Sequence, residues 1–116
     1  MIRLTVLYNL SAGVSEEEFV KWRLTEHQRS NLAIDGVIRT DFSRVNAAWP
    51  EDTEPTYRFI TTLDWPDWQS FQKGFYAPEV QASMNKNLQK LDNPVFLISE
   101  ILVNEIKHET NVSTTS

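Results

Sequence analysis

The sequence of 116 residues contains no cysteine, which excludes disulfide bonds, thiolate metal sites and cysteine nucleophiles. Its three glycines are scattered, so a glycine-rich phosphate loop is excluded as well. Histidine is scarce, and His27 has no second ligand at a suitable spacing, so we predict no bound metal. We likewise expect no resident cofactor; a haem would need an axial ligand, and His27 is the residue that could supply it.

The chain also lacks long apolar runs and runs of lysine or arginine. No apolar stretch approaches the roughly 20 residues that span a bilayer, and the first residues lack a basic segment followed by a long apolar one. The net charge of -5 offers no electrostatic footprint for nucleic acid or for an anionic membrane. We therefore expect a cytoplasmic protein with neither nucleic acid nor membrane as a partner.

What the sequence does contain suits one globular domain, which we place at residues 1–106. Hydrophobic residues make up 41% of the chain and aromatic residues 11%, which is enough for a single core. Residues 107–116 are polar and rich in serine and threonine, so we predict a flexible C-terminal tail there.

Hydrophobic periodicity and breaker residues predict six elements. Apolar and polar residues alternate over residues 2–9, which is typical of a strand with one buried face. Ser15, with Glu18 three residues later, predicts the start of a helix over residues 16–32. The other predictions are strands over residues 37–46 and 56–65, a helical region broken near Gly74 and Pro78 into residues 67–73 and 78–91, and a strand over residues 95–106.

This β-α-β-β-α-β order is that of a ferredoxin-like α+β fold, with a four-stranded antiparallel sheet and both helical regions on one face. The other face, formed by alternate residues of all four strands, then needs a cover. The sheet of a second copy is the simplest cover. We therefore predict a homodimer in which two sheets close an α/β barrel.

The helix over residues 16–32 carries polar side chains where apolar ones belong. At about 100° per residue, Arg23 and His27 are neighbours. They fall on the apolar face formed by Phe19, Val20, Leu24 and Ile34, with Glu26 and Ser30 beside them. A polar group turned toward a core is costly unless it finds a partner or lines a cavity. Arg23 and His27 are therefore our candidate catalytic residues.

Four segments of the chain together resemble a known family. They are residues 2–8, Trp22 and Arg23 with His27 downstream, residues 36–39, and residues 75–81. Over residues 1–103 the chain resembles the EthD-like family of the dimeric α/β-barrel superfamily. The resemblance implies a homodimer in which each subunit keeps a pocket between sheet and helices, with the helix-borne histidine facing that pocket. Related barrels include polyketide cyclases, muconolactone isomerases, cofactor-independent monooxygenases and haem-degrading enzymes, whereas EthD itself implies an accessory role in an ether-degrading oxygenase system.

Each candidate catalytic residue has a chemical and a structural interpretation. His27 suits a general acid or base, because its ordinary pKa of about 6.5 lies near neutral pH. It could equally be a histidine at the core edge, satisfied by a carboxylate or carbonyl. Arg23 could hold a carboxylate, enolate or phenolate oxygen, or it could pair with Glu26 or Asp41.

Further residues are candidates for substrate binding. Tyr8 could orient an oxygen in the pocket, or simply pack with its hydroxyl reaching water. Asp41 could polarise His27 or act as a base, although the pattern leaves open which face of the sheet it occupies. The cluster Trp65, Trp68, Phe71, Phe75 and Tyr76 is predicted as core, and Trp68, Phe75 and Tyr76 from it could also wall a flat apolar ligand.

Two functions fit these residues. The first is a cofactor-independent enzyme of isomerase, cyclase or oxygenase type that acts on an apolar cyclic or enolisable small molecule. The second is a non-catalytic ligand-binding or accessory protein of an oxygenase system. A small apolar or aromatic ligand is expected in both cases, and the substrate itself cannot be named from the sequence.

Overall fold

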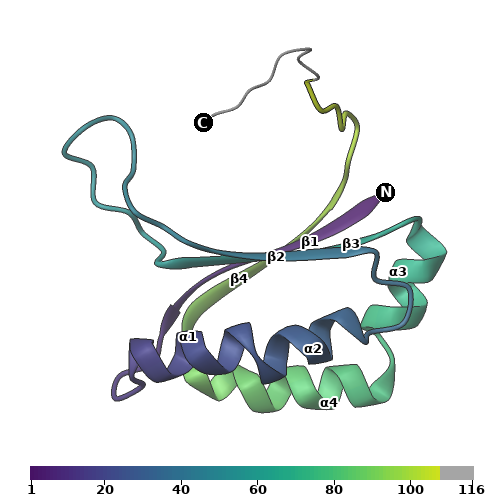
Figure 1. Cartoon of the computed structure of the whole chain (residues 1–116), viewed down its shortest axis with the longest axis horizontal. Helices are drawn as coiled ribbons and strands as arrows, with labels where there is room; N and C mark the ends of the chain where they lie inside the picture. Colours follow the sequence, from purple (N-terminus) through teal and green to yellow (C-terminus); the bar gives the residue numbers. More distant parts are fainter. Residues whose placement is uncertain (108–116) are drawn as a thin grey trace.

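A computed structural model describes residues 1–107 and shows a four-stranded antiparallel sheet with helices on one face (Figure 1). The elements are β1 (Ile2–Leu10), α1 (Glu16–Leu24), α2 (Glu26–Leu32), β2 (Arg39–Arg44), β3 (Phe59–Trp65), α3 (Trp68–Phe75), α4 (Pro78–Asn87), the 3-10 turn η1 (Leu88–Lys90) and β4 (Leu91–Glu100). The strands are ordered β2-β3-β1-β4, which confirms the predicted ferredoxin-like fold. The sheet of one chain stays open. Apart from Lys107, the tail predicted at residues 107–116 lies outside the described residues.

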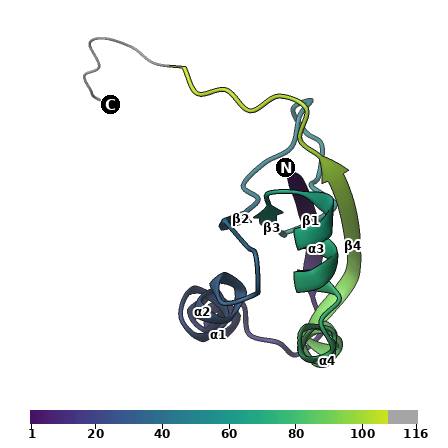
Figure 2. The same ribbon diagram turned by 90° about the vertical axis from the view of Figure 1, so that its right-hand side faces the viewer.

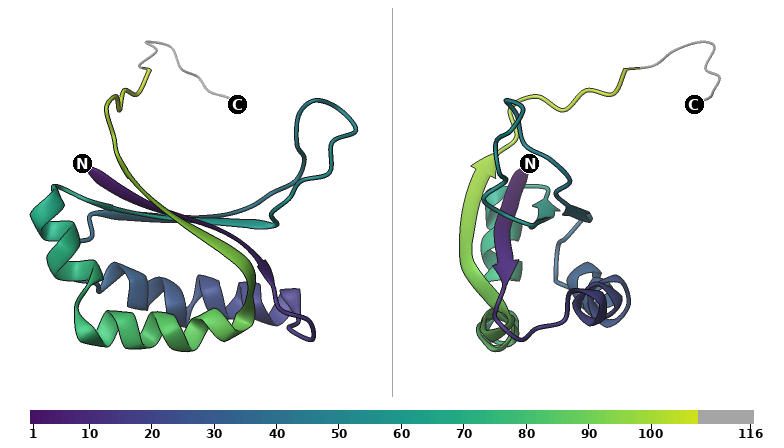
Figure 3. Two further views of the ribbon diagram at one scale, coloured as in Figure 1. Left: turned by 180° about the vertical axis from the view of Figure 1, so that it is seen from behind. Right: turned by 90° about the vertical axis from the view of Figure 1, so that its left-hand side faces the viewer.

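The helices form two separate supports beneath the sheet. Viewed end on, α1 and α2 lie on one side and α4 on the other, with α3 leading down from β3 to α4 (Figure 2). The opposite views show all of them on the same face of the sheet, whose other face carries no helix (Figure 3). The space between the two supports is therefore bounded by the sheet, α2 and α4.

The core begins with the alternation in β1. Ile2, Leu4, Val6 and Tyr8 are buried against the helices, as predicted from their period of two. Antiparallel pairing places β3 residues of the same face beside them, and these include the fully buried Phe59 and Trp65. Apolar burial on this one face holds the helices to the sheet.

The single helix predicted over residues 16–32 is in fact two helices that meet at Thr25. The Thr25 hydroxyl donates a hydrogen bond to the Lys21 carbonyl at 2.8 Å, and its backbone N–H bonds to the Trp22 carbonyl three residues back. This tighter bonding and the side-chain bond interrupt the regular helix. Leu24, predicted on the inner face, is 60% exposed, because it lies about 100° round α1 from the buried Arg23.

The last strand begins and ends earlier than predicted. Asp92, Asn93 and Pro94, expected to precede it, lie within β4 because Leu10 and Asn9 of β1 pair with Leu91 and Asp92. Pro94 is tolerated because β4 is an edge strand, where a missing N–H need not break a ladder. The strand ends at Glu100 because its partner β1 begins at Ile2.

The strands around the hairpin are shorter than predicted. β2 spans Arg39–Arg44 rather than residues 37–46, and β3 spans Phe59–Trp65 rather than residues 56–65. The ladder between these strands ends at the pair Arg44 and Phe59. One more hydrogen bond, from the Val45 N–H to the Arg58 carbonyl, follows it, and the long loop begins there.

The break between the second pair of helices lies where it was predicted, but Gly74 is not the breaker. Gly74 lies inside α3, which ends at Phe75, and α4 begins at Pro78. A Cβ at position 74 would overlap the Asp35 carbonyl oxygen and lie 2.8 Å from the Trp65 indole nitrogen. That nitrogen donates a hydrogen bond to the same Asp35 carbonyl at 3.0 Å. Glycine is therefore required here by the close approach of α3 to the turn that follows α2.

Candidate functional site

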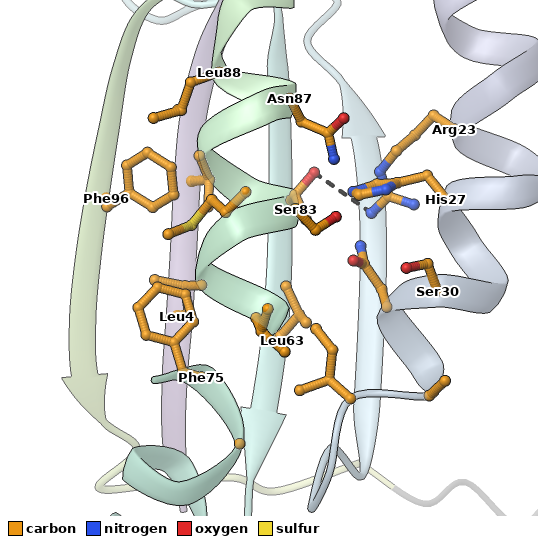
Figure 4. Close-up of a pocket in the computed structure, with 18 of the residues that line it drawn as sticks. Leu4, Arg23, His27, Ser30, Leu63, Phe75, Ser83, Asn87, Leu88 and Phe96 are labelled. Atoms are coloured by element: carbon orange, nitrogen blue, oxygen red, sulfur yellow. Dashed lines mark hydrogen bonds between the residues drawn. The ribbon is translucent and has the colours of Figure 1, made fainter. Parts of the chain in front are cut away.

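A pocket of about 390 Å³ lies between the sheet and the helices α2 and α4. Figure 4 shows polar side chains of α1 and α2 facing those of α4, with the labelled apolar side chains on the sheet, on α3 and just after α4. The apolar part is lined by Leu4, Val6, Leu63, Phe75, Met84 and Phe96, among others. A volume of this size, mostly apolar with a few convergent polar groups, is typical of a small-molecule site.

Arg23 is the most buried polar side chain of the pocket, with 1% of its surface exposed. Its guanidinium donates to the Gln28 side-chain oxygen at 2.8 Å and, at 3.5 Å, to the Thr61 hydroxyl. The guanidinium also lies over the Phe42 ring, 4.6 Å from its centroid. Burial lowers the pKa of Arg23, and the nearby Tyr8 and Asp41 partly offset that effect.

The ion pair considered for Arg23 with Glu26 or Asp41 is wrong. Among residues 1–107, no carboxylate lies within ion-pairing distance of the Arg23 guanidinium. Asp41 pairs instead with Arg39, and Glu26 is exposed. The polar partners of Arg23 are neutral, so its positive charge is not compensated inside the pocket.

His27 follows Arg23 by one helical turn and lines the same wall. Its ring stacks on Trp22, with the centroids 4.4 Å apart. Burial lowers the pKa of His27 to about 4, and the positive charges of Arg23 and Lys90 add to this effect. No carboxylate or carbonyl of the described residues accepts a hydrogen bond from the ring, so the interpretation as a satisfied core-edge histidine is not supported. At neutral pH His27 is an uncharged imidazole facing the pocket.

Tyr8 lines the pocket from the sheet. Its hydroxyl does not reach water, as considered for a tyrosine at a strand end, but shares a hydrogen bond of 2.9 Å with the Thr61 hydroxyl. Burial raises the pKa of Tyr8, and Thr61 and Arg23 oppose that rise. Tyr8, Thr61 and Arg23 therefore form one polar group at the sheet side of the pocket.

Three of the predicted binding residues lie outside the pocket. Asp41 is on the open face of the sheet, opposite Thr62 in the register, because the face alternates along β2 and Phe42 takes the inner side. Trp68 and Tyr76 of the aromatic cluster are 48% and 52% exposed, and the helical period of α3 turns Phe71 and Phe75 inward instead. Of the aromatic residues proposed as a wall, Phe75 lines the cavity.

Asp41 belongs to a network of charges on that open face. Arg3 binds Asp64 through two hydrogen bonds of 2.8 and 2.9 Å, and Arg39 contacts both Asp64 and Asp41. Burial by itself would raise the pKa of Asp64, but Arg3 and Arg39 hold it below its usual range. These charges satisfy one another and are separated by the sheet from the pocket.

Several pocket residues were not among the predictions. Asn31 and Thr61 are buried polar side chains of the wall, and Ser83 and Asn87 approach from α4. Figure 4 shows Ser83 and Asn87 directed toward Arg23 of α1 and His27 of α2. The spacing of Ser83 and Asn87, four residues apart beside the apolar Met84 and Leu88, is the sequence signal that could have indicated a second polar stripe.

Comparison with known proteins decides the family. A family model described as REDY-like protein HapK matches residues 2–102. The chain belongs to the REDY-like HapK family. No curated protein matches the sequence.

Solved structures similar to this HapK family member share its fold. An EthD family protein from Bacillus halodurans superposes with a TM-score of 0.72 at 17% identity, covering 88% of this chain and 99% of that one. A dimeric ferredoxin-like protein of unknown function from Thermobifida fusca gives 0.65 at 17% identity, covering 86% and 90%. The hydroxynitrile lyase of Passiflora edulis gives 0.68 at 14% identity, covering 92% and 96%. The predicted likeness to EthD-like proteins is thereby confirmed.

The described part of this HapK family member offers no cluster of three or more metal-binding side chains. No helix within residues 1–107 has the length and apolar character needed to cross a bilayer. The absence of a cofactor and the cytoplasmic location stay predictions.

Proposed function

We propose that this protein binds an apolar, cyclic or enolisable small molecule in the pocket and moves a proton on it. His27 is the acid-base residue in this proposal, and Arg23 holds the oxygen on which negative charge develops. The observation that carries it is the juxtaposition of an uncharged imidazole with a buried guanidinium; within residues 1–107 the imidazole has no hydrogen-bond partner and no carboxylate neutralises the guanidinium. Proton abstraction next to a carbonyl requires a base to take the proton and a positive charge to stabilise the oxygen that becomes negative.

In the proposed reaction, residues of the pocket both remove and return the proton. A ring nitrogen of His27 takes the proton from the carbon beside a substrate carbonyl. The electron pair of that C–H bond forms a C=C bond, and the π pair of the carbonyl moves onto its oxygen. The resulting enolate oxygen is stabilised by the Arg23 guanidinium, and the imidazolium returns the proton to the same carbon or, in a conjugated substrate, to the γ-carbon. Removal of water by the apolar lining strengthens the charge interaction.

A pKa of about 4 makes His27 a weak base while the pocket is empty. Part of this lowering comes from the positive charges of Arg23 and Lys90. A negative oxygen developing beside Arg23 offsets that field, so the pKa of His27 rises as the proton is transferred. The fold also supports an enzyme, since a hydroxynitrile lyase is built on it.

The proton-transfer role can be measured without knowing the natural substrate. We expect the protein to accelerate exchange of the α-hydrogens of 2-tetralone, an apolar bicyclic ketone, for deuterium in D2O, as followed by NMR. His27→Gln should reduce this acceleration by about 100-fold or more, as for loss of a general base. Glu26→Gln, next to His27 but exposed and outside the pocket lining, should leave it unchanged. Equal exchange rates in the wild type and His27→Gln would contradict the role of His27.

Binding without chemistry is the alternative, and the low pKa of His27 favours it. In that case the stacked rings of Trp22 and His27 serve as a flat wall for an aromatic ligand. Quenching of tryptophan fluorescence by 2-tetralone with no acceleration of exchange would support this alternative.

We also propose that two copies pair through the open face of the sheet. This face carries apolar residues of three strands, among them Leu7, Ile60 and Leu97, and no element of the described chain covers it. Leu97 is 51% exposed, and apolar patches of this kind mark interfaces. The similar Thermobifida fusca protein is described as dimeric.

Replacement of Leu97 by glutamate is expected to convert the dimer into a monomer. The substitution places a charge at an apolar contact, where it would be buried without a partner. Light scattering during gel filtration should show the mass of two chains for the wild type and of one chain for Leu97→Glu. Leu24→Glu, at an exposed leucine on the helix side, should remain dimeric. A monomeric wild type would disprove the pairing.

A further inference from the structure

The Arg23 side chain is a buried charge that no carboxylate among residues 1–107 neutralises. Burying a charge is expensive unless an opposite charge or a ligand compensates it. Gln28, an amide, occupies the position at 2.8 Å from the guanidinium where a glutamate would make an ion pair. Gln28, Thr61 and Tyr8 can take three of the five guanidinium N–H donors, which leaves two without an acceptor on the described chain.

A second buried polar group faces the same space. Asn31 is 6% exposed and lines the pocket, one helical turn beyond His27. Its side-chain amide has no hydrogen-bond partner among residues 1–107. Every side-chain polar atom of these residues that is fully shielded from solvent does have a partner, so the Asn31 amide is not fully shielded. The Asn31 amide is therefore open to the cavity. It can donate to a ligand oxygen beside Arg23.

The charges around the pocket are distributed unevenly. Arg23 lies on the wall at His27, and Lys90 is close enough to act on the same imidazole. The acidic lining residues are Asp35, in the turn after α2, and Glu79, in the first turn of α4. Asp35 is also paired with Lys73 at 3.6 Å. The positive potential is thus concentrated at the end of the pocket where Arg23 and His27 lie.

We infer that the ligand of this pocket carries an anionic oxygen, a carboxylate or a phenolate, which Arg23 and Asn31 bind, while its apolar ring body occupies the space lined by Leu4, Leu63 and Phe75. The inference rests on the proposed function, because it assumes that the pocket admits an apolar small molecule. The inference adds two properties of that molecule: it is an anion, and its charged end lies at Arg23 and Asn31. Gln28 acts as the residue that sets this charge preference, since its neutral side chain keeps Arg23 available.

Gln28 offers a sharp test because it touches Arg23 without lining the pocket. Gln28→Glu places a carboxylate at the same hydrogen-bonding position and neutralises the guanidinium, with the pocket wall unchanged. The variant should also fold at least as well as the wild type, because it gives a buried charge its partner. Gln28→Leu is the matched control, since it removes the hydrogen bond and adds no charge.

The probes are 2-naphthoate and its neutral analogue 2-naphthamide at pH 7, with binding followed by calorimetry and by tryptophan fluorescence. The wild type should bind 2-naphthoate about 10-fold more tightly than 2-naphthamide, or better. Gln28→Glu should lose at least about 10-fold in affinity for 2-naphthoate and stay within about threefold for 2-naphthamide. Gln28→Leu should keep the preference of the wild type for the anion.

The possible failures are distinguishable. If both probes bind equally well to the wild type and Gln28→Glu changes neither affinity, the charge preference is disproved while the apolar pocket stands. If neither probe binds to the folded wild type, the proposed function fails together with the inference. Thermal unfolding of each variant shows whether the fold is intact.

Discussion

Between pH 6.5 and pH 4, the unfolding free energy of the wild-type protein is expected to fall by about 3 kcal/mol more than that of the His27→Gln variant. The pKa of His27 is lowered from 6.5 to about 4, first by burial and then by Arg23 and Lys90. The unfolded chain therefore binds a proton at His27 in this interval and the folded chain does not. Folding stability then falls as the pH falls, because protons favour the state that binds them.

The sign and the window of this effect follow from the two pKa values. Above pH 6.5 the imidazole is neutral in both states, so its full contribution is present. Below about pH 4 the folded protein also binds the proton, and the loss reaches its limit. The acidic groups with lowered pKa values, such as Glu16, Asp64 and Asp67, contribute mainly below this window.

Urea unfolding at a series of pH values measures the effect as a difference between the wild type and His27→Gln. The variant removes the titrating ring and leaves the carboxylates, so contributions common to both proteins cancel. Parallel stability curves would contradict the buried position of His27. Titration of the His27 ring protons by NMR gives the pKa directly, and saturating 2-naphthoate should raise it if an anion binds at Arg23.

Gly74→Ala is expected to destabilise the protein by about 3 kcal/mol, or to prevent folding, although it lies inside a helix. By helix propensity alone the change would stabilise α3 by about 1 kcal/mol. The steric effect is larger, because the added methyl group meets the Asp35 carbonyl, which is backbone and cannot rotate away. Relief of the overlap would also separate Trp65 from its hydrogen-bond acceptor.

Gly13→Ala is the control for this prediction. Gly13 has a φ of +87° and no neighbouring atom within 4 Å of an added Cβ, so the change costs conformational strain without a clash. We expect a loss of about 1 kcal/mol there. Urea unfolding compares the two variants, and a Gly74→Ala protein as stable as the wild type would disprove the close packing of α3 on Asp35.

Local patterns predicted the elements that local forces determine. The alternation over residues 2–9 predicted the inner face of β1, and Pro78 predicted the start of α4. The spacing of Arg23 and His27 placed both side chains on one wall, and they remain there despite the break at Thr25. Each of these predictions depends on the backbone geometry of a helix or strand over a few neighbouring residues.

Long-range pairing decided the boundaries that the patterns missed. The start of β4 at Leu91 depends on pairing with Leu10, more than eighty residues earlier in the chain. The face on which Asp41 lies depends on the register between β2 and β3, because a shift of one residue would invert it. Neither register can be read from the segment itself.

The sequence by itself determined the order of strands and helices in this protein and the presence of an arginine and a histidine on an inward helical face. Only the tertiary structure decided what those two residues meet. It left Arg23 with neutral partners, lowered the pKa of His27 by burial, and brought Ser83 and Asn87 from a distant helix to the same pocket. The physical reason is that charge compensation and desolvation depend on atoms brought together from separate segments, whereas helix and strand periodicity depend on near neighbours in the chain.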